Sequence, residues 1–422
     1  MQHNDIYNLI KKLWPLNRSL AGVENRKSLK ILKEICPNLM IKSFKSGSKV
    51  FDWTVPNEWN VREAYIKNSK GKKIVDFKKN NLHLMSYSEP VSKFINLKDL
   101  KKKLFSNKDL PNAIPYRTSF YKRDWGFCVT DNFIKKLKKD KYYVKIDSKF
   151  KKGLMNYGEI VIKGKSKKEI LLTSNICHPS LANNELSGPS LLIYLAKHII
   201  ELKNLNYSYR ILFLPETIGS IAYISKNFKQ LKKNVIFGMS LICLAGPGNF
   251  TLVSSKYGNN YVDNIAKYAF KKYLKNSKIL TWYHRGSDER QFGSPIIDIP
   301  FISISKTKYD TYKEYHTSLD NLNFINSKQI LLSYNFLKKL IFIIENNCTP
   351  KVKYACEPFL QKYGLYNKND EKSLNVDSKL SVDILSYADG TNSLCEISNI
   401  LDLSFEKILK IYLELKKFKI VY

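Results

Sequence analysis

The 422-residue chain lacks several features that mark common classes of protein. Its seven cysteines stand singly, without a Cys-x-x-Cys pair or a tight cluster, which argues against a zinc ribbon and a dense disulfide framework. No run approaches the roughly 18 apolar residues of a membrane span, and the first twenty residues hold no apolar stretch of the signal-peptide type. We therefore expect a cytoplasmic protein with no membrane span.

Arginine and acidic residues are scarce beside lysine. Lysine and arginine number 71 against 37 aspartates and glutamates, which gives a formal net charge of +34, yet only eight of the 71 are arginine. Lysine, asparagine and isoleucine are abundant along the whole chain, as an AT-biased genome would encode. We attribute the charge mainly to this bias, and binding of nucleic acid or another anionic surface stays open as the alternative.

The composition is that of a folded protein with more than one domain. Hydrophobic residues make up 44% of the chain and aromatic residues 13%, which excludes disordered, collagen-like and low-complexity classes. A chain of this length usually forms two or three domains.

Changes of pattern divide the chain into three predicted parts. Alternating apolar residues and turn signals predict a small β-rich insertion over residues 47–110. Residues 1–46 and 111–349 begin with amphipathic helices and continue with strands and helices in turn, which predicts one discontinuous α/β domain. Residues 350–422 contain a capping box and two short helices, which favours a winged-helix module.

Within the α/β part, short apolar runs predict five core strands, at 159–163, 169–174, 209–214, 235–241 and 301–305. Helical spacing predicts three helices, at 191–202, 262–274 and 330–344. Open α/β sheets bind ligands outside the carboxyl ends of their strands, so the residues after each strand are the candidates for chemistry.

Polar clusters at such positions contain His178, Glu216, Asp288 and His316. Neutral imidazole and carboxylate are the ligands of a catalytic zinc ion, and a spare carboxylate can activate water as a base. These residues therefore predict a catalytic metal site assembled from separate loops. Cys177 beside His178 is not expected to form a Cys-His nucleophile pair, because adjacent residues on an extended loop point apart.

Four motifs in order carry a resemblance: Cys-His-Pro-Ser-x-Ala-Asn-Asn-Glu-Leu-Ser-Gly from Cys177, Pro-Glu-Thr-Ile-Gly-Ser from Pro215, Gly-Ser-Asp-Glu-Arg-Gln-Phe from Gly286, and Tyr-His-Thr-Ser-x-Asp from Tyr315. They resemble the bacterial aminopeptidase-like proteins often encoded in surface-polysaccharide gene clusters. The resemblance implies an α/β fold with a zinc-exopeptidase-like mixed sheet flanked by helices, a small β-rich inserted domain and a C-terminal winged helix. It also implies a metal-dependent amide hydrolase acting on a peptide or an acylated amino sugar.

By position, the resemblance implies that His178, Asp288 and His316 are metal ligands. It implies that Glu216 is the catalytic general base, which takes a proton from metal-bound water. We also assign four residues to substrate binding, namely Asn184, His284, Arg285 and Tyr315, with a surface pair as the alternative for His284 and Arg285.

The sequence departs from the family pattern at three positions. Ser180 stands where an aspartate usually orients the first histidine, Asn184 at the metal-bridging aspartate, and Thr217 at the second glutamate of a pair. Glu185, beside Asn184, is a candidate substitute ligand. Because these changes remove anionic ligands, we expect one zinc ion in each chain rather than two.

Two other functions stay open. The three departures are also consistent with a metal-binding scaffold without turnover. The lysine-rich composition and the tail permit a nucleic-acid-binding regulator, but residues 396–403 contain no lysine or arginine, and the next is Lys407. We therefore expect the tail to serve dimerisation or domain packing, with a small molecule or peptide as the partner rather than nucleic acid. A homo-oligomer, and a role of the insertion as a lid, are left open.

Overall fold

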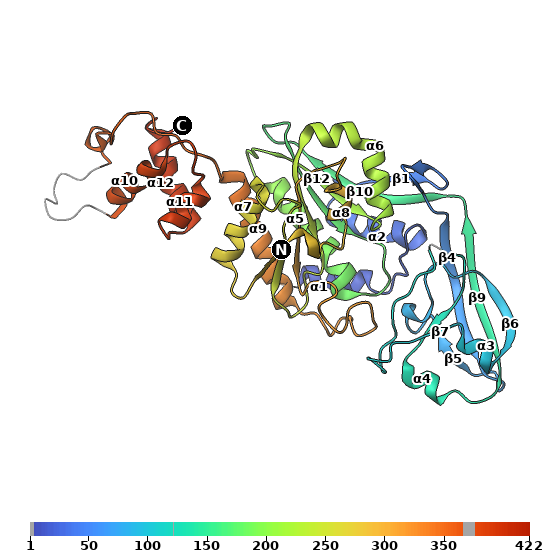
Figure 1. Cartoon of the computed structure of the whole chain (residues 1–422). Coiled ribbons are helices and arrows are strands. Elements are labelled where there is room, and N and C mark those ends of the chain that lie inside the picture. The colour runs from blue at the N-terminus through green and yellow to red at the C-terminus, as the bar shows by residue number, and fades with distance from the viewer. Residues whose placement is uncertain (1–3, 121, 366–375) are drawn as a thin grey trace. The chain divides into compact units, whose positions relative to one another are not determined.

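The computed structural model describes residues 4–120, 122–365 and 376–422. They divide into two compact units (Figure 1). The first unit lies within Met1–Asp263 and Asn276–Phe336, and the second within Asn264–Lys275 and Leu337–Tyr422. In the described part of the chain, no helix combines the length and the apolar character needed to cross a bilayer.

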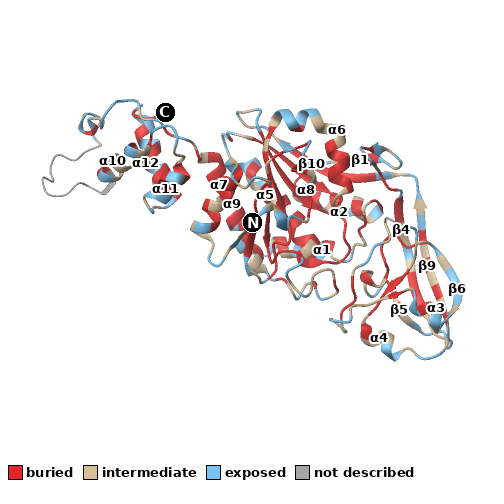
Figure 2. Cartoon of the chain, in the orientation of Figure 1, coloured by how far each residue is buried: buried red, intermediate tan, exposed pale blue. Residues whose placement is uncertain are grey.

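The first unit is built on an eight-stranded mixed sheet with the strand order β1-β10-β12-β11-β13-β16-β14-β15. The strands are β1 (Met40–Lys45), β10 (Leu154–Ile162), β11 (Glu169–Asn175), β12 (Ser208–Leu214), β13 (Val235–Leu241), β14 (Phe250–Val253), β15 (Lys278–Leu280) and β16 (Phe301–Lys306). The central strands β12, β11, β13 and β16 are parallel, and all of β11, β12 and β16 is buried (Figure 2). The five predicted core strands correspond to β10, β11, β12, β13 and β16 and are confirmed. They could be recognised in the sequence because strands covered on both faces are runs of apolar residues.

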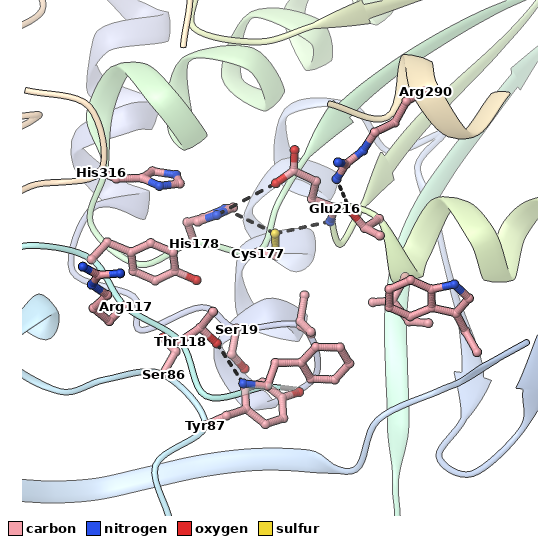
Figure 3. A pocket seen from close by; sticks show the side chains of 16 residues that line it. Ser19, Ser86, Tyr87, Arg117, Thr118, Cys177, His178, Glu216, Arg290 and His316 are labelled. Atoms are coloured by element: carbon pink, nitrogen blue, oxygen red, sulfur yellow. Dashed lines mark hydrogen bonds and ion pairs between the residues drawn. The ribbon is translucent and has the colours of Figure 1, made fainter. Parts of the chain in front are cut away.

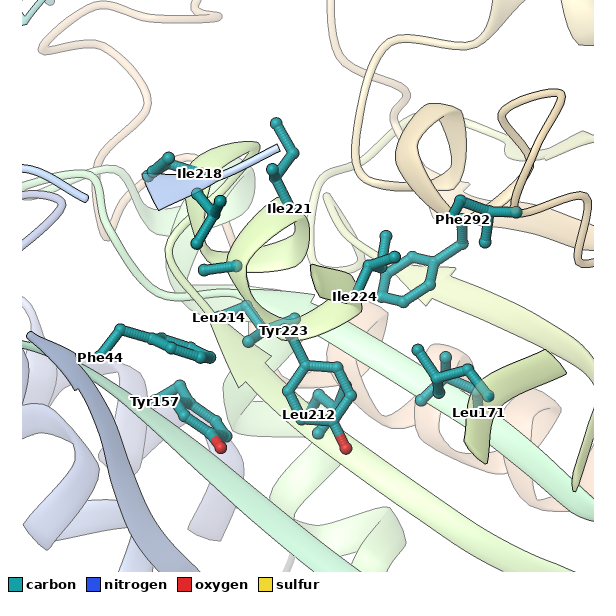
Figure 4. Close-up of a cluster of buried hydrophobic side chains, with 14 of the residues drawn as sticks. Phe44, Tyr157, Leu171, Leu212, Leu214, Ile218, Ile221, Tyr223, Ile224 and Phe292 are labelled. Carbon is teal, nitrogen blue, oxygen red and sulfur yellow. The ribbon is translucent and has the colours of Figure 1, made fainter. Parts of the chain in front are cut away.

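Helices cover both faces of this sheet. They are α1 (Asp5–Leu13), α2 (Val23–Ile35), α5 (Ser187–Glu201), α6 (Ile218–Asn234) and α8 (Glu289–Phe292). Alternate residues of a strand face opposite sides. Leu212 and Leu214 pack against α6 in one buried cluster (Figure 4), whereas Phe213 lies with Leu29 of α2 beside Gly158.

A second, four-stranded antiparallel sheet has the order β5-β4-β9-β6. Its strands are β4 (Glu58–Lys67), β5 (Lys73–Asp76), β6 (Val91–Asn96) and β9 (Lys141–Lys151). Strand β9 pairs with β4 and β6 and buries alternate residues. This sheet therefore extends past residue 110, the predicted end of the insertion, and the domain boundaries at 46 and 349 stay predictions. Smaller elements near this sheet are α3 (Leu97–Lys101), β7 (Leu104–Phe105), β8 (Phe127–Cys128) and α4 (Asp131–Lys136). The short strands β2 (Lys49–Val50) and β3 (Trp53–Thr54) pair with each other and pack beside α6.

The second unit contains α10 (Val376–Tyr387), α11 (Leu394–Ile400) and α12 (Phe405–Lys417), together with the ends of α7 (Tyr261–Tyr273) and α9 (Ser327–Asn346). The predicted capping box is present, with Ser393 and Glu396 each accepting a hydrogen bond from the other's backbone.

The turn between α11 and α12 is held by α7 and α9. Tyr268 lies 2.7 Å from the Ser398 hydroxyl, and Lys272 pairs with Asp402 at 2.7 Å. Glu406, in the first turn of α12, accepts a hydrogen bond from Tyr273 at 3.0 Å and pairs with Lys339. The N-terminal end of α12 is therefore engaged inside its own unit.

Candidate functional site

His178 follows β11 and is held by Glu185, which comes from the π-helical turn η2 (Ala182–Leu186). The Glu185 carboxylate accepts hydrogen bonds from the backbone N–H groups of Cys177 and His178, and its Oε2 lies 2.8 Å from His178 Nδ1. An ionised carboxylate only accepts, so Nδ1 carries the proton. The other ring nitrogen, Nε2, is left facing Glu216, 3.9 Å from its Oε2.

The pKa values of this pair are shifted by its own charges. Burial opposes the charged form of His178, but the Glu185 carboxylate outweighs burial and raises the pKa of His178. Burial likewise opposes the charged form of Glu185, and His178 outweighs it and lowers the Glu185 pKa. Such a carboxylate–imidazole pair fixes the tautomer and the orientation of a ligand histidine.

Glu216 lies in the short connection between β12 and α6, two residues after the strand ends at Leu214. The next residue, Thr217, has a φ of 64°, which is costly for a β-branched residue and sharpens the turn between strand and helix. Glu216 Oε1 accepts a hydrogen bond from the Ser287 hydroxyl at 3.0 Å. Burial, followed by the nearby Glu185, raises the pKa of Glu216, which is the direction that a general base at neutral pH needs.

Three buried polar atoms of the predicted site have no hydrogen-bond partner among the described residues: Oδ2 of Asp288, Nε2 of His316 and Oδ1 of Asn184. Asp288 uses its other oxygen to accept from the Thr217 N–H at 2.8 Å. Buried polar atoms are nearly always paired, so unpaired ones call for an explanation. Imidazole nitrogen and carboxylate oxygen are zinc ligands, so a bound metal would satisfy two of the three atoms with its usual ligand types.

The predicted metal ligands do not all lie as close together as the ligands of one bound metal ion. Among the described His, Cys, Asp and Glu side chains, one group of three has potential ligand atoms that all lie within 4.8 Å of one another, namely Cys177, His178 and Glu185. Its Glu185 oxygens already accept three N–H groups, and burial raises the pKa of Cys177 well above its usual range, so the thiol keeps its proton. The His178 and His316 rings are 5.3 Å apart between centroids. His178, His316 and Asp288 therefore fit a metal by the chemistry of their side chains. Glu185, the fourth predicted ligand, is instead the hydrogen-bond partner of His178.

A pocket of about 350 Å³ opens over His178 and Glu216 (Figure 3). Ser86, Tyr87, residues 116–118 and Phe120 line it from the chain between β5 and β9. The backbone N–H of Tyr116 donates to the His316 carbonyl at 2.7 Å, which ties this segment to the site. The remaining lining residues are Ser19, Leu20, Trp53, Cys177, Thr217, Ile218, Arg290 and His316.

The four predicted substrate-binding residues do not line this pocket. Arg285 is exposed over the Trp282 ring at 5.5 Å, and His284 is exposed beside it. Tyr315 stacks on the His316 ring, with centroids 3.9 Å apart. Arg117 and Arg290 line the pocket but are not among the predicted site residues, although Arg290 stands in the motif that begins at Gly286. The scarcity of arginine is the signal that could have drawn attention to both.

Comparison with known proteins places the chain in a family. A family model described as "Domain of unknown function (DUF4910)" matches residues 7–347, and a winged helix-turn-helix model matches residues 347–422. The chain belongs to the DUF4910 family. A Clostridium acetobutylicum protein, provisionally named a polysaccharide biosynthesis protein with an aminopeptidase-like domain, is 42% identical over 406 residues, covering 96% of this chain and 93% of its own.

Solved structures share the fold of this chain. A provisionally named peptidase from Clostridium acetobutylicum superposes with a TM-score of 0.93 at 39% identity, covering 100% of this chain and 96% of that one. A zinc aminopeptidase from Bacillus subtilis superposes with a TM-score of 0.60 at 13% identity, covering 81% and 95%. The predicted family resemblance and fold class, an aminopeptidase-like mixed sheet with a C-terminal winged helix, are confirmed.

Proposed function

We propose that this protein is a metal-dependent hydrolase of amide bonds, related in mechanism to zinc aminopeptidases and using one zinc ion per chain. The observation that carries the proposal is that Glu216 and His178 line one pocket, while a nitrogen of His316 and an oxygen of Asp288 are buried without a hydrogen-bond partner among the described residues. His178 and His316 through Nε2, and Asp288 through Oδ2, would hold the metal.

When bound, zinc supplies a Lewis acid that activates water and polarises a carbonyl. The chain's own residues supply the proton transfers. Glu216 takes a proton from the water that attacks the amide carbon and gives it to the leaving nitrogen as the C–N bond breaks. Glu185 holds the proton on Nδ1 of His178, which leaves the lone pair on Nε2.

We propose a small peptide or an acylated amino sugar of surface-polysaccharide metabolism as the substrate, in the cytoplasm. The name of the Clostridium relative supports the link to polysaccharide biosynthesis. The pocket volume, about 350 Å³, suits a small molecule.

We assign the winged helix to packing within the protein rather than to reading nucleic acid. Winged helices contact DNA bases with the N-terminal residues of the second helix of the motif. Here that end of α12 is occupied, since Glu406 pairs with Lys339 and accepts from Tyr273, and Asp402 pairs with Lys272. Lysine excess alone does not favour a regulator over a hydrolase.

Zinc content and turnover, measured together, test the proposal. We expect near one zinc per chain by elemental mass spectrometry, and hydrolysis of some members of a panel of peptides and N-acyl amino sugars. Glu216→Gln should lower turnover by about 10²- to 10⁴-fold with zinc and fold retained. Glu201→Gln, at the exposed end of α5, is the matched control. Unchanged turnover in Glu216→Gln would refute the base assignment, and no zinc uptake by the wild type would refute the mechanism.

A further inference from the structure

The charge of the pocket lining is the reverse of what a free amino group in the substrate would need. Two guanidinium groups, Arg117 and Arg290, and a single carboxylate, Glu216, are among the lining residues (Figure 3). In that view the two arginines lie on opposite sides of the His178–Glu216 pair. An ammonium group would be repelled by both arginines and attracted only by Glu216.

Glu216 cannot serve an ammonium group and the reaction together. Its Oε1 accepts from the Ser287 hydroxyl, and its Oε2 faces His178 Nε2 at 3.9 Å. A carboxylate paired with a substrate ammonium would be stabilised in its charged form and would be a weaker base for water. Among the residues that line the pocket, no second carboxylate is present to take the ammonium instead.

Arg117 is the better placed of the two cations for a substrate anion. Arg290 already donates from Nη2 to the Thr217 hydroxyl at 2.8 Å. The guanidinium of Arg117 makes no hydrogen bond or ion pair within the described part of the chain, and its neighbour Tyr116 is tied to His316. A guanidinium offers N–H donors in a fork that matches both oxygens of a carboxylate.

We propose, resting on the proposed function, that the substrate is an amide that carries a carboxylate, and that Arg117 binds this carboxylate while Glu216 acts on the amide. The rings of Trp53, Tyr87 and Phe120 in the same lining give apolar contact to the acyl group or sugar ring between them. The protein is then specific for acidic amides rather than for peptides with a free amino end.

Matched ligand pairs test this assignment by calorimetry on the full-length, zinc-loaded wild type, which keeps the Glu216 carboxylate, and the recovered ligands are checked for hydrolysis. One pair is N-acetylglucosamine and its 3-O-lactyl derivative, which adds a carboxylate to the same amide and ring. The other is N-acetylalanine and alanine methylamide, which carry a carboxylate and an ammonium. We expect the carboxylate member of each pair to bind more tightly, and Arg117→Gln to weaken it by about 10- to 100-fold while leaving the neutral sugar unchanged.

Two variants control the charge and the position of the arginine. Arg117→Lys keeps the charge but not the fork, so its loss should be intermediate. Arg123→Gln removes an exposed arginine of the same segment, which lies over Phe150 at 5.4 Å and outside the pocket, and should leave the dissociation constants unchanged. Tighter binding of the ammonium member, tighter binding of a phosphate-bearing N-acyl sugar than of the carboxylate, or no effect of Arg117→Gln would overturn the inference.

The two proposals fail in different ways. Binding that depends on Arg117, with no amide hydrolysed by the wild type, would leave the anion site standing and refute the hydrolase. Hydrolysis that depends on Glu216 but prefers uncharged or ammonium amides would support the hydrolase and refute the anion site.

Discussion

The His178 side of the site and the His316 side are built in contrasting ways. On the first side, Glu185 holds the ring nitrogen Nδ1, and the buried Arg18 donates from Nε to the His178 carbonyl at 3.0 Å. On the second side, Nε2 of His316 and Oδ2 of Asp288 are buried without a partner among the described residues. The Nδ1 nitrogen of His178 is thus satisfied by the protein, whereas the Nε2 nitrogen of His316 and the Oδ2 oxygen of Asp288 are not.

The pKa shifts follow the same division. Burial, with the neighbouring His178, lowers the pKa of His316 to about 3, and burial, with Glu216, raises the pKa of Asp288. Both groups are thus driven toward their neutral forms, whereas His178 and Glu185 are driven toward their charged forms. A dication at the second side would reverse its shifts and supply the missing partners. The contrast teaches that the protein itself orients His178, whereas His316 and Asp288 need a bound ion to pair their buried atoms.

The largest expected effect comes from breaking the satisfied side. Glu185→Ala leaves the His178 imidazole and two backbone N–H groups buried without an acceptor, so we expect the free energy of unfolding to fall by about 3–5 kcal/mol. All five tryptophans lie in the first unit, so tryptophan fluorescence during urea unfolding reports on that unit.

Two variants delimit this result. Glu185→Gln keeps one acceptor oxygen and should lose less than Glu185→Ala. Glu34→Ala removes an exposed carboxylate paired with Lys12 and should cost less than about 1 kcal/mol. If Glu185→Ala and Glu34→Ala cost the same, the His178–Glu185 pair does not hold this side of the site.

A second prediction concerns the unsatisfied side. Zinc added to metal-free wild type at 100 times its dissociation constant should stabilise the fold by about 2.7 kcal/mol, seen as a higher unfolding temperature. Asp288→Asn and His316→Ala should abolish this zinc effect. Without zinc, His316→Ala should lower the free energy of unfolding only slightly, because the Nε2 nitrogen that it removes has no hydrogen-bond partner among the described residues.

The control for the zinc effect is His284→Ala, which removes an exposed histidine from the loop of Asp288 and should keep the full shift. A zinc shift that persists in both Asp288→Asn and His316→Ala would place the metal elsewhere and would remove the contrast between the two sides.

The fold could be predicted from sequence further than the site. Buried parallel strands such as β11 are apolar runs that end in polar residues, so their position and the chemistry after them can be seen locally. Strand β9 also alternates, but it pairs with β4 and β6, which lie far from it in sequence, and no local pattern reports such pairing.

At the site, the sequence does not report the contacts that individual atoms make. Glu185 was assigned as a ligand, yet the π-helical turn η2 directs its carboxylate to Nδ1 of His178. Glu185 thereby provides the orienting carboxylate that is missing at Ser180, whose hydroxyl instead donates to the Trp14 carbonyl. Arg117 reaches the pocket from another part of the chain, which only the tertiary fold shows.

Asp320 links the His178 side of the site to the His316 side. The effect of its protonation on the free energy of unfolding should be the smallest of those predicted here. It follows His316 by four residues, and its carboxylate accepts from the N–H groups of Asn183 at 2.7 Å and Asn184 at 3.0 Å, in the turn that carries Glu185. Burial raises the pKa of Asp320 to about 6, although these donors and the Tyr312 hydroxyl favour the charged form.

The sign of the pH effect follows from this shift. An unfolded aspartate ionises near pH 4, so between about pH 4 and 6 the folded state binds more protons than the unfolded state. The contribution of Asp320 to stability is therefore largest below pH 4 and falls by roughly 1–3 kcal/mol as the pH rises to about 6. Subtracting the unfolding free energies of Asp320→Asn from those of the wild type at each pH isolates this term. Tyr312→Phe removes one donor to the carboxylate and should extend the falling window to higher pH. A difference that is constant from pH 4 to 7 would mean that Asp320 is ionised throughout, and that the join between the two sides is held by charge rather than by a buried acid.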